Sequence, residues 1–182
     1  HQDGHSHVLA SVVPNLVSYD PAYAYELATI VREGIRRMHE NQEPIFYYLT
    51  VTNESYRQPR LPERVSEGII RGIYLLCPAD VVGPQVQLMG SGAILNEVIA
   101  AQKLLAERFS VAADVWSVTS YSELRRDALD VDRWNMLHSG ESPRRAFLVG
   151  ALENAQGPFV AATDYLKSLP DAVAKWLPGR LI

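Results

Sequence analysis

The chain begins with HQDGHSH, which places His1, Asp3, His5 and His7 at alternate positions. Histidine is the side chain best suited to proton transfer near neutral pH, because its ordinary pKa of about 6.5 lies close to that range. The pattern therefore predicts an active-site loop. Two alternatives stay open. One is a metal site, because alternate side chains share a face of an extended segment. The other is a polar loop whose imidazoles hydrogen-bond to the backbone.

A second candidate for chemistry is the glycine-rich turn formed by Gly90, Ser91 and Gly92, which follows a short apolar run beginning at Val86. Turns of this kind between a strand and a helix often bind phosphate groups. This one lacks the third glycine of the dinucleotide fingerprint and the lysine of a P-loop. We therefore interpret it as a strand-to-helix turn that needs glycine for its geometry.

The elements around this turn predict the fold. Residues 93–109 predict a helix, and strands are predicted from Val86 and over residues 113–120 and 158–165, each followed by a helical stretch. The helix after the second strand is expected to start near Ser120. Strands that alternate with helices indicate an α/β fold with a mainly parallel sheet flanked by helices. The buried stripe predicted for the helix over 93–109 consists of Ile94, Val98, Ala101, Leu105 and Phe109.

The first part of the chain predicts a strand over residues 12–17, a helix that begins at Pro21 and carries an apolar stripe over residues 24–38, and a buried strand over residues 45–51. Asp20 is expected to cap this helix, with Pro21 at its first position. Three tyrosines near its start are interpreted as packing residues with surface hydroxyls, namely Tyr19, Tyr23 and Tyr25.

A polar stretch with Pro59 and Pro62 indicates a connection between domains. We place the boundary between Glu54 and Gly68, which divides the chain into residues 1–60 and 61–182.

The composition limits the possible functions. A hydrophobic fraction of 47% with 21% charged residues is typical of a packed soluble protein. The net charge of −4 argues against a nucleic-acid partner, and no apolar run reaches the roughly 18 residues of a membrane helix. Cys77 is the only cysteine, which indicates a reducing compartment, the cytoplasm. No signal peptide is recognised, and because the chain begins inside a motif, we expect a piece of a longer protein.

Several motifs occur in a characteristic order: HQDGHSH, SYDPAYAYE, YYLTVTNESY, GSG before a helix, ADVWSVTSYSELRRDA and DRWNMLH. In this order they resemble the C-terminal third of the homodimeric bacterial pyruvate dehydrogenase E1 family, which is related to transketolase. The resemblance covers essentially all 182 residues. It implies that residues 1–60 are the C-terminal part of a middle, pyrimidine-type domain that binds thiamine diphosphate. It also implies that residues 61–182 are a transketolase C-terminal-like domain, truncated at its end.

The resemblance also implies a function. Enzymes of this family decarboxylate pyruvate on thiamine diphosphate with Mg²⁺, and reductively acetylate the lipoyl group of the E2 dihydrolipoyl acetyltransferase. The family's GDG…N element and its activating glutamate are absent from this chain. We therefore expect most cofactor ligands to lie outside it, no metal ligands within it, and no activity from the chain alone.

Roles for the histidine loop follow from the same resemblance. His1 matches the first histidine of the family motif H-E-D-G-H-S-H, which implies substrate positioning and proton transfer. His7 aligns with a histidine that lines the active site of transketolases. Asp3 and His5 would orient these rings, and Gln2 stands where the family has glutamate.

Two other segments are interpreted as structural. Asp164 and Tyr165 end the third predicted strand, where ligands gather in open α/β sheets. The resemblance places that end at a dimer interface, which favours a structural role. Trp134 and Met136, in DRWNMLH, are expected to pack in the interior.

Three alternative functions remain: a fragment of a transketolase-like carbon-transfer enzyme, a non-catalytic α/β interaction module, and a metal-binding protein. Transketolases favour a Gly-Pro-Thr-His loop, whereas this chain has HQDGHSH. The metal-binding alternative predicts tight Zn²⁺ or Ni²⁺ binding that is lost on His5→Ala.

Overall fold

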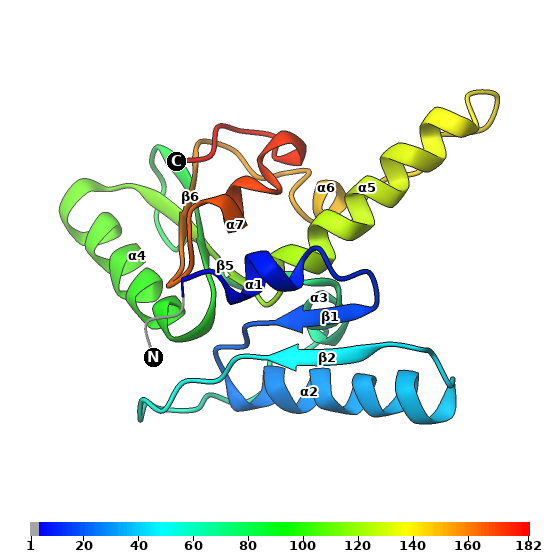
Figure 1. Ribbon diagram of the computed structural model, residues 1–182. Coiled ribbons are helices and arrows are strands. Elements are labelled where there is room, and N and C mark those ends of the chain that lie inside the picture. The colour runs from blue at the N-terminus through cyan, green and yellow to red at the C-terminus, as the bar shows by residue number, and fades with distance from the viewer. Residues whose placement is uncertain (1–3) are drawn as a thin grey trace.

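The computed structural model describes residues 4–182 (Figure 1). The roles expected of His1 and Asp3 concern residues outside this described part. The helices are α1 (Ser6–Ala10), α2 (Ala24–Ile35), α3 (Ser66–Arg71), α4 (Leu95–Phe109), α5 (Tyr121–Leu137), α6 (Phe147–Ala151) and α7 (Ser168–Asp171). The strands are β1 (Leu16–Tyr19), β2 (Phe46–Leu49), β3 (Ile73–Cys77), β4 (Gln85–Gly90), β5 (Ala112–Val118) and β6 (Phe159–Ala162). The π-helix η1 (Arg36–Glu40) follows α2, and two 3₁₀ helices are η2 (Gly92–Ile94) and η3 (Ala174–Trp176).

The strands form two sheets. A four-stranded sheet has the order β3-β5-β4-β6, and a two-stranded sheet joins β1 to β2 in parallel. In the larger sheet β4 pairs in parallel with both β5 and β6, which confirms the predicted mainly parallel sheet. The edge strand β3 runs antiparallel to β5 and was not predicted from the sequence.

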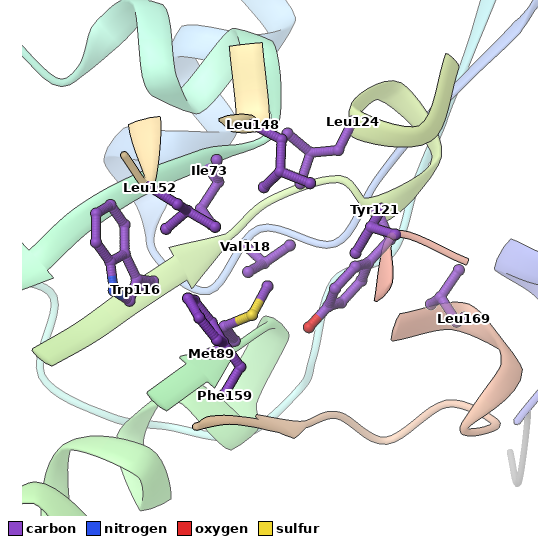
Figure 2. Close-up of a cluster of buried hydrophobic side chains, with 11 residues drawn as sticks. Ile73, Met89, Trp116, Val118, Tyr121, Leu124, Leu148, Leu152, Phe159 and Leu169 are labelled. Atoms are coloured by element: carbon purple, nitrogen blue, oxygen red, sulfur yellow. The ribbon is translucent and has the colours of Figure 1, made fainter. Parts of the chain in front are cut away.

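Side chains of the larger sheet alternate between two buried clusters, as expected for strands covered on both faces. Figure 2 shows one cluster, in which Met89 of β4 and Phe159 of β6 lie close to Val118 of β5, with Leu124 of α5 packed nearby. The opposite face holds Val86, Leu88, Ala113 and Val115, packed against Leu95 and Val98 of α4. The two central strands are therefore buried on both sides.

A third cluster joins the two sheets. Val17 and Tyr19 of β1 pack with Ile30 of α2, Ile69 of α3 and Tyr74 of β3. All five are at most 4% exposed. The first and second parts of the chain therefore share a continuous apolar interior where these elements meet.

The start of the chain differs from the prediction in two ways. The first strand is Leu16–Tyr19 rather than residues 12–17, because α1 and the turn that follows it occupy the preceding positions, and Val12 is 77% exposed. The residue before α2 is Tyr23, not Asp20. The Glu26 carboxylate accepts the N–H groups of Ala22 at 2.6 Å and Tyr23 at 3.0 Å, so it satisfies the helix start without Asp20.

The packing role predicted for Tyr19, Tyr23 and Tyr25 is confirmed, but Tyr19 and Tyr23 are buried more deeply than side chains with surface hydroxyls would be. Tyr19 is 2% and Tyr23 is 5% exposed. The Tyr19 hydroxyl donates to the carbonyl oxygen of Ile70 at 2.6 Å, which meets the hydrogen-bonding requirement of a buried phenol. Burial also raises the pKa of Tyr23 to about 12.

The predicted helix over 93–109 is confirmed as α4, and its buried stripe is confirmed in part, because Val98 is buried and Ile94 and Leu105 pack against the same cluster. Leu95 is fully buried, whereas Phe109 is 68% exposed. Fifteen positions at about 100° each carry Phe109 about 60° away from the line of Ile94, so the two cannot share one narrow face. Ser120 accepts the N–H of Glu123 at 3.0 Å and caps α5 as predicted.

The far half of α5 projects away from the rest of the chain in Figure 1. Met136 on this half is 71% exposed, which corrects its predicted interior position. Trp134 is half-buried, stacks on His138 and lies under the guanidinium of Arg144. Across residues 4–182, no helix combines the length and apolarity that a membrane crossing requires.

Candidate functional site

An open cavity of about 810 Å³ lies where strands of both sheets end. Asp20 and Thr50, which line it, directly follow β1 and β2, and two further lining residues, Gly92 and Asp164, come two positions after β4 and β6. The carboxyl ends of parallel strands are the usual place for ligands in open α/β folds. We call this space the strand-end cavity.

Asp20 is held by backbone hydrogen bonds on both sides. Its N–H donates to the carbonyl oxygen of Thr119 at 2.8 Å, and its own carbonyl accepts the N–H of Gly92 at 3.1 Å. Gly92 has φ +52°, and a Cβ there would lie 2.7 Å from Oδ2 of Asp20. Glycine at this position therefore allows the turn after β4 to approach the carboxylate.

The carboxyl group of Asp20 is electrostatically unusual. Burial raises its pKa to about 6, from an ordinary value of 3.8, because the charged form loses hydration. Hydrogen bonds from Thr50 and Ser91 oppose this shift, while the charges of Asp164 and Glu26 add to it. A carboxyl group with such a pKa can exchange protons near neutral pH.

His7 lies beside this carboxyl group. It is only 3% exposed, and its Nε2 is 2.9 Å from Oγ1 of Thr50. Oγ1 of Thr50 in turn donates to Oδ1 of Asp20 at 2.7 Å. The imidazole is held edge-on against two aromatic rings, with centroid distances of 4.6 Å to Tyr165 and 5.4 Å to Tyr48.

The structure separates the predicted histidines. The chain is helical from Ser6, so His5 and His7 do not share a face as they would in an extended segment. His5 is exposed at the start of α1, whereas His7 is buried against Thr50. His1 and Asp3 lie outside the described residues, and Gly4, next in the chain, lines the strand-end cavity.

Asp20 and Thr50 were not singled out from the sequence as functional residues. Each directly follows a strand, and ligands usually bind at the carboxyl ends of strands in open α/β folds. This position is the sequence feature that could have identified them. Asp20 was instead assigned to a helix cap because Asp-Pro is a common start of a helix.

The described residues do not fit the diphosphate or the metal of the implied cofactor. Among the residues that the structure describes, the lining of the strand-end cavity includes two carboxylates, Asp20 and Asp164, and no lysine or arginine. Within residues 4–182, no three side chains of His, Cys, Asp or Glu lie together in a way that would hold a metal ion. A diphosphate would meet like charges here, so we derive no step through the cofactor.

Comparisons with known proteins show which family the chain belongs to. Residues 1–59 match the family model of the pyruvate dehydrogenase E1 component middle domain, and residues 72–178 match that of the transketolase-like TK C-terminal domain. The chain belongs to the transketolase-like C-terminal domain family. The predicted fold class and the resemblance to pyruvate dehydrogenase E1 are thereby confirmed.

Relatives of this family are similar along the whole chain. The chain is 52% identical over 181 residues to a pyruvate dehydrogenase E1 component from Pseudomonas aeruginosa, covering 99% of the chain and 20% of the relative. The corresponding protein of Escherichia coli is 47% identical over 180 residues, with 98% and 20% covered. The chain thus spans about a fifth of the length of these curated relatives.

The fold is shared with solved transketolases. A transketolase mutant from Pichia stipitis superposes with a TM-score of 0.59 at 14% identity, covering 97% of this chain and 25% of that one. At this identity the likeness shows the fold alone.

Proposed function

We propose that this chain is the C-terminal part of a pyruvate dehydrogenase E1 component. The parent enzyme would decarboxylate pyruvate with thiamine diphosphate and Mg²⁺ and transfer the acetyl unit reductively to the lipoyl group of E2. The observation that carries this proposal is the 40–52% identity along the whole chain to proteins named pyruvate dehydrogenase E1 component. We further propose that the parent is a cytoplasmic homodimer.

Within that parent, residues 1–60 would complete the middle domain and residues 61–182 would form the C-terminal domain. The chain would contribute the strand-end cavity and the histidine loop of residues 1–7. The loop would supply proton transfer and positioning through His1 and His7, with Asp3 and His5 as orienting partners. In the parent, the cofactor would supply the electron sink for decarboxylation.

The charge of the cavity supports a division of labour between this chain and the rest of the parent. Pyruvate is an anion, and the described lining offers Asp20 and Asp164 but no cationic side chain. Binding of its carboxylate therefore requires groups beyond the described residues, such as His1 and parts of the parent outside this chain. The chain alone is expected to be inactive.

The test is pyruvate-dependent reduction of an artificial electron acceptor with thiamine diphosphate and Mg²⁺ present. The full-length parent and this 182-residue chain are assayed side by side. We expect activity in the parent only, with a decrease of at least about tenfold in its His1→Ala variant.

A folded parent that binds the cofactor but does not consume pyruvate would overturn the proposal. Sugar phosphates would then be tested as substrates, because a transketolase-like enzyme transfers carbon units between them.

A further inference from the structure

We propose that Asp20 is a positioning residue that acts on His7 through the hydroxyl of Thr50 and holds a hydrogen on Nε2 of the imidazole. This inference deepens the proposed function, because it rests on His7 serving the proton transfers of the parent enzyme. It concerns three residues from three elements: α1, the end of β1 and the end of β2.

The argument begins with the single hydrogen of the Thr50 hydroxyl. Besides Nε2 of His7 at 2.9 Å, two oxygen acceptors lie within reach of this hydrogen: Oδ1 of Asp20 at 2.7 Å and the carbonyl oxygen of Tyr19 at 3.3 Å. The ionised carboxylate is both the closer and the stronger acceptor. The hydrogen therefore points toward Asp20 and away from His7.

The tautomer of His7 follows from this direction. Nε2 of His7 lies 2.9 Å from Oγ1 of Thr50, and that oxygen now presents only lone pairs to the ring. A hydrogen bond between them requires Nε2 to carry the hydrogen and donate it. The hydrogen bond from Nε2 to Thr50 then fixes the orientation of the imidazole ring.

The surroundings keep this arrangement in place. The imidazole is 3% exposed and fixed between Tyr48 and Tyr165, so it cannot turn freely to exchange its nitrogens. The backbone of Asp20 is tied to Thr119 and Gly92. Thr50 is tied through its own N–H to the carbonyl of Tyr19 at 3.1 Å.

Protonation of Asp20 removes the preference of the Thr50 hydroxyl hydrogen for Asp20. A neutral carboxyl group is a weaker acceptor and can itself donate to Thr50, whose hydrogen is then free to turn to Tyr19 or to Nε2. Because the pKa of Asp20 is about 6, this release occurs close to physiological pH. The titratable groups around Asp20 are His7 of α1, Glu26 of α2, Tyr56 after β2, Tyr121 of α5 and Asp164 after β6.

The experiment measures kcat and KM for pyruvate with the full-length parent between pH 5 and pH 9. Four variants are compared with the unaltered enzyme: Asp20→Asn, Thr50→Val, Thr50→Ser and Asp164→Asn. We expect the unaltered parent to lose kcat as Asp20 becomes protonated. Thr50→Val should lower kcat at least about tenfold with little change in KM and should abolish this acid limb, because the link to His7 is cut.

The remaining variants separate positioning from a general structural role. Asp20→Asn should also abolish the acid limb, because its amide oxygen accepts from Thr50 at every pH. Thr50→Ser keeps the hydroxyl and should restore both kcat and the limb. Asp164→Asn should keep the limb but move it to lower pH, because the charge of Asp164 raises the pKa of Asp20.

An acid limb that persists unchanged in both Thr50→Val and Asp20→Asn would overturn the inference. Should either variant fail to fold, the other two still decide it: the inference expects the acid limb of kcat at its original pH in Thr50→Ser and at lower pH in Asp164→Asn, and a limb that does not move in Asp164→Asn would overturn it. A parent without pyruvate-dependent activity would instead count against the proposed function. Neutron diffraction from crystals of the parent would then decide the inference, with deuterium on Nε2 of His7 above about pD 7 supporting it and a bare Nε2 overturning it.

Discussion

The hydroxyl of Tyr74 on β3 donates a 2.6 Å hydrogen bond to Oε1 of Glu26 on α2, 48 positions earlier in the chain. The same oxygen accepts the hydroxyl of Ser117 on β5 at 2.6 Å. Glu26 is fully buried, and its other oxygen accepts the backbone at the start of α2. One carboxylate thus ties α2 to two strands of the larger sheet.

Glu26→Gln is expected to lower the free energy of unfolding by about 2 kcal/mol, because an amide cannot accept from donors on both sides. Urea unfolding of this chain measures the change. Glu33→Gln on the same helix is the matched control, since Glu33 pairs with Arg36 near the surface and should cost at most about 0.5 kcal/mol. Equal losses in the two variants would contradict the proposed importance of the buried carboxylate.

Two methionines offer a direct test of the core. Met89 is fully buried in the cluster of Figure 2, and Met136 is 71% exposed on the projecting half of α5. Met89→Ala should lower the free energy of unfolding by about 2–5 kcal/mol, because it leaves a cavity among Val118, Phe159 and their neighbours. Met136→Ala should change it by less than about 0.5 kcal/mol. A large loss from Met136→Ala would show that the far half of α5 is packed against other residues.

Gly92→Ala is expected to disturb the strand-end cavity. The new Cβ would lie 2.7 Å from Oδ2 of Asp20 at a backbone φ of +52°, so the carboxylate or the turn must move. We expect the parent enzyme to lose at least about tenfold in kcat. Gly150→Ala in α6 is the control, because no atom lies within 4 Å of its added Cβ, and its kcat should equal that of the unaltered enzyme. Full activity of Gly92→Ala would contradict a role of the strand-end cavity in the reaction.

The raised pKa of Asp20 also makes stability depend on pH. The folded protein holds the proton up to about pH 6, whereas an unfolded chain releases it near the ordinary value of 3.8. Protonation of Asp20 therefore stabilises the folded protein by at most about 3 kcal/mol. This contribution to the free energy of unfolding is fully present below about pH 4 and is lost as the pH rises to about 6. Asp20→Asn should remove this contribution, so that its unfolding free energy exceeds that of the unaltered chain increasingly between pH 4 and pH 6. A difference that stays constant over this range would contradict the burial of the Asp20 charge.

The sequence by itself determined much of the second part of the chain. Glycine before a periodic apolar segment predicted β4 and α4, and Ser120 predicted the start of α5, because these signals act through neighbouring residues. The ordered motifs identified the family, which the family models confirm.

Only the tertiary structure decided how Asp20, Thr50 and His7 are related. Asp20 was predicted to cap α2, but the N–H groups at the start of this helix donate to the Glu26 carboxylate instead. The parallel pairing of β1 with β2 places Thr50 beside Asp20. The helical turn of α1 then brought His7 to the same hydroxyl and left His5 exposed. Local sequence patterns do not reveal such contacts, because Thr50 lies 30 positions from Asp20 and 43 positions from His7 in the chain. The packing of the elements determines which of several possible partners each residue contacts.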